Sequence, residues 1–208
     1  AVILYLRKEL LLLLRKLMTL NLKENTFIVK VVIATLPSVF LGYFIYDIVS
    51  EYFRNLKLVA ISSIIFAILL FVADRIKYNE QKWISISYKN AFIVGMFQIL
   101  AFIPGASRAG VTITGARFLG LNRSNAAIFS MLLSIPIILA SVFLSSINLL
   151  NSEISQTNLV QPLFSAFVAC ITALLSINIM MKLIKKGNFN LFIIYRILLG
   201  FLLLYFYA

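Results

Sequence analysis

An arginine that lies between two apolar runs, with no acidic residue nearby, most constrains how this chain can fold. Arg108 lies in the segment Phe-Ile-Pro-Gly-Ala-Ser-Arg-Ala-Gly-Val-Thr, residues 102–112. No acidic residue stands between Glu80 and Glu153. An arginine at the hydrophobic depth of a membrane costs roughly 2.5–3.5 kcal/mol on insertion scales, so its charge needs a partner. That partner is therefore either distant in the sequence or an anionic ligand.

The backbone around Arg108 favours an anion site. Pro104 ends the preceding helix because it lacks an N–H and its ring clashes with the previous turn. Small side chains leave amide N–H groups uncovered, and uncovered amides that lead into a helix N-terminus bind anions. The residues of this predicted site are Gly105, Ala106, Ser107, Arg108, Gly110 and Thr112. A second interpretation stays open: a helix break, with Ser107 as N-cap and Arg108 extended to the membrane interface.

Composition places the chain in a membrane. Hydrophobic residues make up 62% of the sequence and the mean hydropathy is +1.02, whereas soluble domains are nearer half apolar. The apolar runs are continuous, which predicts helices because barrel strands alternate. We therefore expect an all-α integral membrane protein. We attribute the net charge of +12 to basic residues at the ends of apolar runs, and not to nucleic-acid binding.

Residues 1–208 are expected to form a single membrane domain. The apolar run 91–103 is too short for a crossing, which needs about 20 residues. Residues 91–121 are therefore predicted to form a re-entrant hairpin that carries Arg108 at its turn. The other predicted segments are an interfacial helix in 7–26, spans at 28–49 and 58–73, a loop at 74–90, a turn at 122–125, and three spans in 126–207, at 126–147, 161–181 and 190–207.

The positions of the basic residues predict the orientation of the loops. If the loop 74–90 is cytoplasmic, nearly all loop lysines and arginines lie inside, with Arg54 and Lys57 as the exceptions. This distribution agrees with the positive-inside rule. Two full crossings at 91–121 would give the same charge distribution, so the re-entrant prediction rests on length alone.

The segment around Arg108 also resembles a known family. Residues 104–112, Pro-Gly-Ala-Ser-Arg-Ala-Gly-Val-Thr, are similar to the second signature of the undecaprenyl-diphosphate phosphatases, also called the bacitracin-resistance family. That signature is Pro-Gly-x-Ser-Arg-Ser-x-x-Thr, so Ala109 departs from it. Other similar stretches are Asp74-Arg75, Gly95, Gln98, Arg117-Phe118-Leu119-Gly120, the run 129–136 and the run 195–200.

The resemblance implies both an activity and a fold. The family hydrolyses undecaprenyl diphosphate to the monophosphate and inorganic phosphate, which recycles the lipid carrier of cell-wall synthesis. Its fold is an inverted-repeat helical bundle with re-entrant hairpins, and residues 1–73 would be the remainder of the first half. By position, Ser107, Arg108 and Thr112 are expected to be catalytic. The residues expected to bind the substrate are Gly105, Ala106, Gly110 and Gln98, the last with helix–helix hydrogen bonding as the alternative.

Part of the family's active site is missing from this sequence. The first family signature has a Glu-x-x-x-Glu pair, thought to hold Mg²⁺ or Ca²⁺, and a histidine, and neither occurs here. No metal ligand is therefore expected in this chain. Because residues 1–6 resemble the end of a membrane helix, we expect upstream sequence to supply these groups. We also expect residues 1–208 alone to release no phosphate. Glu51 and Glu80 are interpreted as surface charges.

Four further residues are interpreted as structural. Arg117 and Arg123 are expected to anchor the chain at the membrane interface. Tyr195 and Arg196 match a family pattern but are interpreted as packing and anchoring residues.

The expected partners are a polyprenyl diphosphate lipid and the bilayer of the bacterial cytoplasmic (inner) membrane, which the protein crosses several times. A homodimer is also considered, and no nucleic acid is expected. The alternative function is a transporter or flippase for a phosphorylated lipid or anion, because broken helices around a midplane site also serve transport. A third interpretation is a structural subunit that gains its missing groups from another chain.

Overall fold

The computed structural model describes residues 1–18, 26–52, 55–77, 82–150 and 160–207, and within these ranges it contains helices and turns but no strand. The first helices are α1 (Val2–Tyr5), α2 (Arg7–Met18), α3 (Thr26–Tyr52) and α4 (Leu56–Arg75). Then come η1 (Trp83–Ser85), α5 (Tyr88–Ile99), η2 (Leu100–Phe102) and α6 (Arg108–Phe118). The last three are α7 (Arg123–Leu150), α8 (Val160–Lys186) and α9 (Asn190–Tyr207).

Length and composition make several of these helices membrane spans. Four described stretches are apolar enough and have 18 or more residues: 56–75, 123–143, 162–185 and 190–207. The prediction of an all-α integral membrane protein is therefore confirmed. Helix α3 is continuous through Pro37, as membrane helices tolerate. Glu80 and residues 19–25 of the expected interfacial helix lie outside the described residues, and so does the side chain of Glu51.

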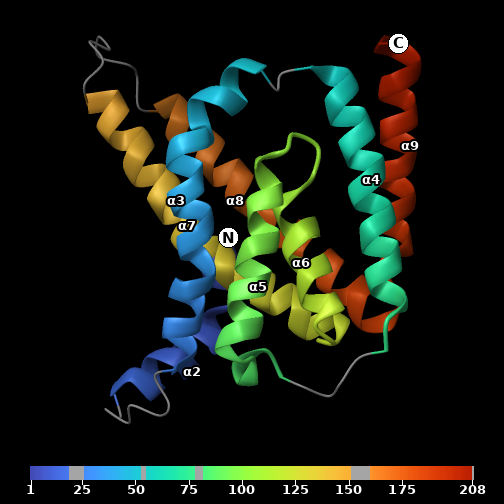
Figure 1. Cartoon of the computed structure of the whole chain (residues 1–208). Helices are drawn as coiled ribbons and strands as arrows, with labels where there is room; N and C mark the ends of the chain where they lie inside the picture. The colour runs from blue at the N-terminus through green and yellow to red at the C-terminus, as the bar shows by residue number, and fades with distance from the viewer. Residues whose placement is uncertain (19–25, 53–54, 78–81, 151–159, 208) are drawn as a thin grey trace.

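A hairpin made of α5, η2 and α6 occupies the centre of the bundle. In Figure 1 both helices begin or end at the lower side, and the loop that joins them stops inside the molecule, between α3 and α4. Helix α5 packs on α3, and α6 packs on α4 and α7. Helix α4 in turn packs along α9. The hairpin is thus enclosed by longer helices, the condition under which irregular backbone is tolerated at membrane depth.

Glycines allow the hairpin to pack closely. A Cβ added at Gly95 of α5 would overlap the backbone carbonyl of Ala34 in α3. A Cβ added at Gly115 of α6 would lie 2.7 Å from Cγ of Phe97 in α5. Small residues at helix contacts let backbones approach closely in membranes, where packing and not water exclusion drives association. These two positions therefore fix the depth to which the hairpin sits.

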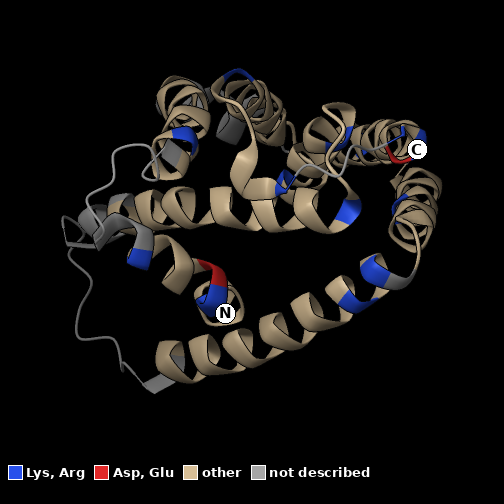
Figure 2. Cartoon of the chain, turned by 90° about the horizontal axis from the view of Figure 1, so that it is seen from below, with Lys and Arg blue, Asp and Glu red and all other residues tan. Residues whose placement is uncertain are grey.

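Charged residues mark the ends of the helices. Seen from below, lysines and arginines stand mainly at helix ends and in the connecting turns, and few acidic residues accompany them (Figure 2). The turns near Asp74, Arg123 and Gly187 are joined to each other by hydrogen bonds, so these three connections lie on one side of the molecule. This arrangement agrees with the loop layout inferred from the sequence, while the assignment of that side to the cytoplasm stays a prediction.

Candidate functional site

The turn between the two hairpin helices forms from a short set of local preferences. Ile103 is extended, with φ −72° and ψ 116°, because a residue before proline avoids the helical region. Helix α6 then begins at Arg108, three residues earlier than the predicted second half-helix. The reason is Ser107, whose hydroxyl accepts a hydrogen bond from the Gly110 amide at 3.3 Å and so acts as N-cap. We call residues 103–110 the tip of the hairpin.

The tip is held against α4. The Ser62 hydroxyl donates to the carbonyl of Pro104. Gly105 has φ +90°, and a Cβ there would overlap Ser62 and the backbone of Val59. Only glycine satisfies both the left-handed backbone and the close approach. The sequence assigned Gly105 to substrate binding, and the structure places it where the shape of the turn is set.

Ser107 has a strained backbone and an open surface. Its φ is 66°, the only positive value outside glycine among the described residues, and its side chain is exposed. Such conformations cost of order 1–3 kcal/mol and persist where the surrounding structure imposes them, often at functional sites. The backbone amides of Ser107, Arg108 and Ala109 have no acceptor among the described residues. Uncovered donors are therefore grouped at the start of α6.

Arg108 adds a positive charge where a helix normally has a negative one. Its Nη1 donates to the carbonyl of Ser134 in α7 at 3.3 Å, and it forms no ion pair with any residue that the structure describes. The first turn of α6 contains no acidic residue, although the N-terminus of a helix carries a partial positive charge. The tip thus concentrates positive charge without compensating it.

Three other residues predicted for the site are buried in contacts inside the bundle. Thr112 is 1% exposed, and its hydroxyl lies 2.6 Å from that of Ser130 in α7 and donates to the Arg108 carbonyl at 2.9 Å. Gln98 is 2% exposed and donates to Ser38 of α3 at 3.1 Å, which is the helix–helix bond considered as its alternative role. The Gln98 carbonyl oxygen has no partner among the described residues. Ala106 is fully buried.

A cavity of about 210 Å³ opens beside the tip. Its polar side chains are those of Ser107, Tyr195 and Arg196. Gly110 also lines it, and its remaining wall is apolar, with side chains such as Phe189 and Phe192. Of the residues predicted for the site, Ser107 and Gly110 therefore share one concave surface. A cavity with a polar end and an apolar wall suits a ligand that has a charged group attached to a hydrocarbon chain.

Arg196 contacts the tip, a placement that its interpretation as a packing and anchoring residue did not specify. It extends from α9, and its Nη2 donates to the carbonyls of Gly105 at 2.6 Å and Ala106 at 3.0 Å. The sequence signal was available, since Arg196 is an arginine within an apolar span, and such residues are functional by default. Arg196 could have been identified from the sequence in the same way as Arg108.

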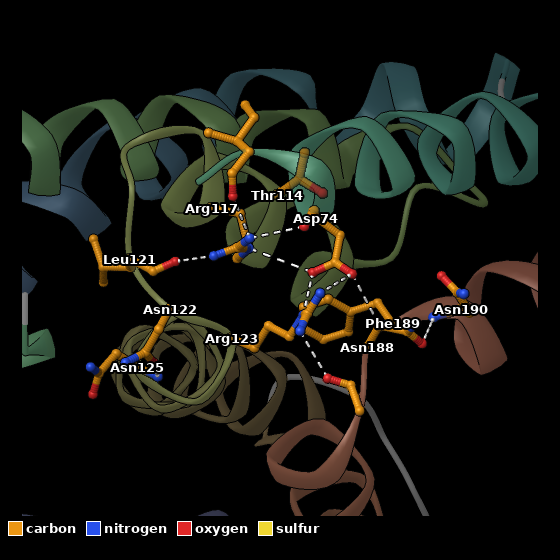
Figure 3. A network of polar contacts seen from close by, with 12 residues as sticks. Asp74, Thr114, Arg117, Leu121, Asn122, Arg123, Asn125, Asn188, Phe189 and Asn190 are labelled. Atoms are coloured by element: carbon orange, nitrogen blue, oxygen red, sulfur yellow. Dashed lines mark hydrogen bonds and ion pairs between the residues drawn. The ribbon is translucent and has the colours of Figure 1, made fainter. Parts of the chain in front are cut away.

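At the opposite end of α6, two arginines share one carboxylate, as Figure 3 shows. Both carboxylate oxygens of Asp74 accept hydrogen bonds from Arg123, from Nε at 2.6 Å and from Nη2 at 3.0 Å. Oδ1 of Asp74 also lies 3.6 Å from Nε of Arg117. Arg117 also donates to the carbonyls of Leu121 and Ile76. We call Asp74, Arg117 and Arg123 the base network. The interpretation of Arg117 as an interface anchor was wrong, because this residue is 1% exposed and holds the end of the hairpin.

A metal site was not expected in this chain. The described residues contain no group of three or more His, Cys, Asp and Glu side chains that is suited to a metal ion. These residues therefore do not fit the divalent cation that the family resemblance implies.

The comparisons with known proteins give one consistent result. The model of the family described as bacitracin resistance protein BacA matches residues 1–202. An undecaprenyl-diphosphatase from Thermosipho africanus is 34% identical over 201 residues, which cover 96% of this chain and 77% of that protein. Undecaprenyl-diphosphatases from Campylobacter curvus and a Ruegeria species are 34% and 35% identical, each over 89% of this chain and over 69% and 70% of their own lengths.

Proposed function

Because the chain belongs to the bacitracin resistance protein BacA family, we propose that it acts as an undecaprenyl-diphosphatase in a membrane. In this reaction water adds to the terminal phosphorus and the bond from that phosphorus to the bridging oxygen breaks. The products are undecaprenyl phosphate and inorganic phosphate. The lipid monophosphate then returns to cell-wall synthesis as the lipid carrier.

The observation that carries this proposal is the uncompensated charge of Arg108 beside uncovered amides. A diphosphate supplies the negative charge that the tip lacks, and a guanidinium binds phosphate oxygens through two parallel hydrogen bonds. As the bridging bond breaks, charge moves onto phosphoryl oxygens, and fixed donors stabilise it without reorganisation. In this proposal Arg108 and the amides of Ser107 and Ala109 hold the diphosphate, and the Ser107 hydroxyl donates a further hydrogen bond.

The cavity beside the tip accounts for the lipid part of the substrate. Its polar wall at Ser107 and Arg196 continues into apolar side chains of α9. In the proposed complex the diphosphate lies at the tip and the first isoprene units follow the apolar wall. Thr112 and Gln98 then act by packing the hairpin against α7 and α3 and not by touching the substrate.

The metal, the membrane and the oligomeric state complete the proposal. We propose that Mg²⁺ or Ca²⁺ is required and is held by groups outside the described residues, that the protein lies in the bacterial inner membrane, and that it forms a homodimer. Chelation that leaves full activity would exclude the metal requirement. Membrane fractionation and mass measurement in detergent test the other two.

Phosphate release by the full-length protein tests the activity. Purified protein is given undecaprenyl diphosphate in detergent, and wild type is compared with Arg108→Lys and with Arg75→Lys, an exposed arginine at the end of α4. Removing one such donor costs about 10²–10³ in kcat, so the Arg108 variant should lose most activity and the Arg75 variant very little. Absence of hydrolysis by the wild type, together with movement of a phosphorylated lipid between vesicle leaflets, would favour the transporter alternative.

A further inference from the structure

Arg196 binds the backbone of the tip from a distant part of the chain. Nη2 of its guanidinium donates both hydrogen bonds, to the carbonyls of Gly105 and Ala106. In a trans peptide the carbonyl and the following N–H point in opposite directions. With the Ala106 carbonyl turned toward Arg196, the amide of Ser107 must point away from it. Arg196 thereby sets the direction of one of the uncovered donors.

Nη1 of the Arg196 guanidinium has no hydrogen-bond partner among the described residues. This nitrogen is buried, and the side chain forms no ion pair with them. Carbonyl oxygens are neutral, so two such bonds leave the positive charge uncompensated. A role in packing alone would not need a charge at this position, and a polar uncharged side chain would hold the turn at lower cost.

Gly110 leaves space for this guanidinium. A Cβ added at Gly110 would lie 2.9 Å from Nη1 of Arg196, so Arg196 lies directly against the first turn of α6. Gly110, Ser107 and Arg196 also line the same cavity. The second uncompensated arginine is thus placed next to the uncovered amides and to Ser107, although 88 residues separate Arg196 from Arg108 in the sequence.

We propose that Arg196 is a positioning residue for the diphosphate: it fixes the tip so that the donors of residues 107–109 face the anion, and it adds a second positive charge behind them. This role rests on the function proposed above. It also explains why Ser107 keeps its unusual backbone, because the two carbonyl bonds of Arg196 lie immediately before that residue.

Three substitutions separate the charge of Arg196 from its hydrogen bonds. Arg196→Lys keeps the charge, Arg196→Gln keeps two N–H donors on one nitrogen, and Arg196→Ala removes both. On full-length protein, KM and kcat for undecaprenyl diphosphate and the melting temperature are measured. The alanine variant should lose about 100-fold or more in kcat/KM, with lysine and glutamine each restoring part of it. Arg75→Ala serves as the control. A lower melting temperature with unchanged kcat and KM in all three variants would overturn the proposal.

Gly110→Ala gives an independent test through a double-mutant cycle. Its Cβ should displace the guanidinium, so it should lower kcat/KM about tenfold in the wild type and much less in the Arg196→Ala background. Additive effects would show that Gly110 and Arg196 act separately and would contradict the proposal.

The same double-mutant cycle is repeated with the affinity for inorganic pyrophosphate as the measured quantity. A wild type that binds pyrophosphate but hydrolyses nothing would disprove the proposed activity, whereas missing coupling would disprove the role of Arg196.

Discussion

Helix α6 has arginines at both of its ends, and the partners of their positive charges differ between the two ends. In the base network, Arg117 and Arg123 share the carboxylate of Asp74. Nη1 and Nη2 of Arg117 and Nη1 of Arg123 also donate to backbone carbonyls. At the tip, the guanidiniums of Arg108 and Arg196 contact only backbone carbonyls among the described residues. The base network therefore contains an acidic partner for its arginines, whereas the tip has none among the described residues.

This difference separates two kinds of buried charge. A paired charge that is fully hydrogen-bonded holds elements together, and removing one partner leaves the other uncompensated. An arginine at membrane depth with no acidic partner is costly and marks a ligand site. The base thus fixes the hairpin in the bundle, and in the function proposed above the tip receives the anion. Substitutions at the base should change mainly stability, and substitutions at the tip should change mainly binding and activity.

The largest effect on stability is expected for Asp74→Asn. It removes the negative charge shared by Arg117 and Arg123 and should lower the free energy of unfolding by about 3–5 kcal/mol. Thermal unfolding in detergent measures this, with the exposed neighbour Arg75→Gln as the control. An Asp74→Asn protein that melts like the wild type would contradict the structural role of the base.

Substitutions at Thr112 test whether this residue belongs to the substrate site at the tip or to the packing of α6. The sequence assigns it to catalysis, but its hydroxyl bonds Ser130 inside the α6–α7 contact. Thr112→Val and Ser130→Ala should each cost about 1–2 kcal/mol of stability, because each leaves a buried polar group without its partner. KM should stay near its wild-type value in both folded variants. A large rise in KM for Thr112→Val alone would return Thr112 to the substrate site.

The smallest change in stability is expected for Ser107→Gly. Glycine relieves the positive φ at this position and is nearly as good an N-cap as serine. Stability should therefore stay constant or rise by up to about 1 kcal/mol. Activity should fall severalfold, because the hydroxyl donor to the diphosphate is lost. Activity equal to that of the wild type would exclude Ser107 as a contact of the substrate.

The sequence predicted the fold class and a short hairpin with Arg108 at its turn, but not the pairing of the arginines. Apolar run length indicated a short hairpin, and Pro104 indicated where its first helix ends, because both signals are local. The partner of Arg117 is Asp74, which lies on another helix. The contact between Arg196 and Gly105 spans 91 positions. Such contacts depend on how helices pack, and no local pattern in a single sequence reveals them.

The two arginines at opposite ends of α6 also show why residue type alone does not predict whether an arginine has an acidic partner. Arg108 and Arg117 lie on one helix, and neither has an acidic residue close to it in the sequence. Arg117 nevertheless finds Asp74 through the packing of α6 against α4, whereas Arg108 finds none among the described residues. A sequence argument treats the two alike, and only the arrangement of helices distinguishes them.

The affinity for inorganic pyrophosphate is the most direct test of the claim that the tip, and not the base, binds the anion. Thermal shifts of full-length wild type, Arg108→Lys and Arg123→Lys are measured over a range of pyrophosphate concentrations. At 100 times Kd the wild type should gain about 2.7 kcal/mol, and a tenfold weaker variant roughly half of that. We expect this loss for Arg108→Lys, and an unchanged Kd for Arg123→Lys despite its lower melting temperature. Equal affinities for Arg108→Lys and wild type would contradict the account.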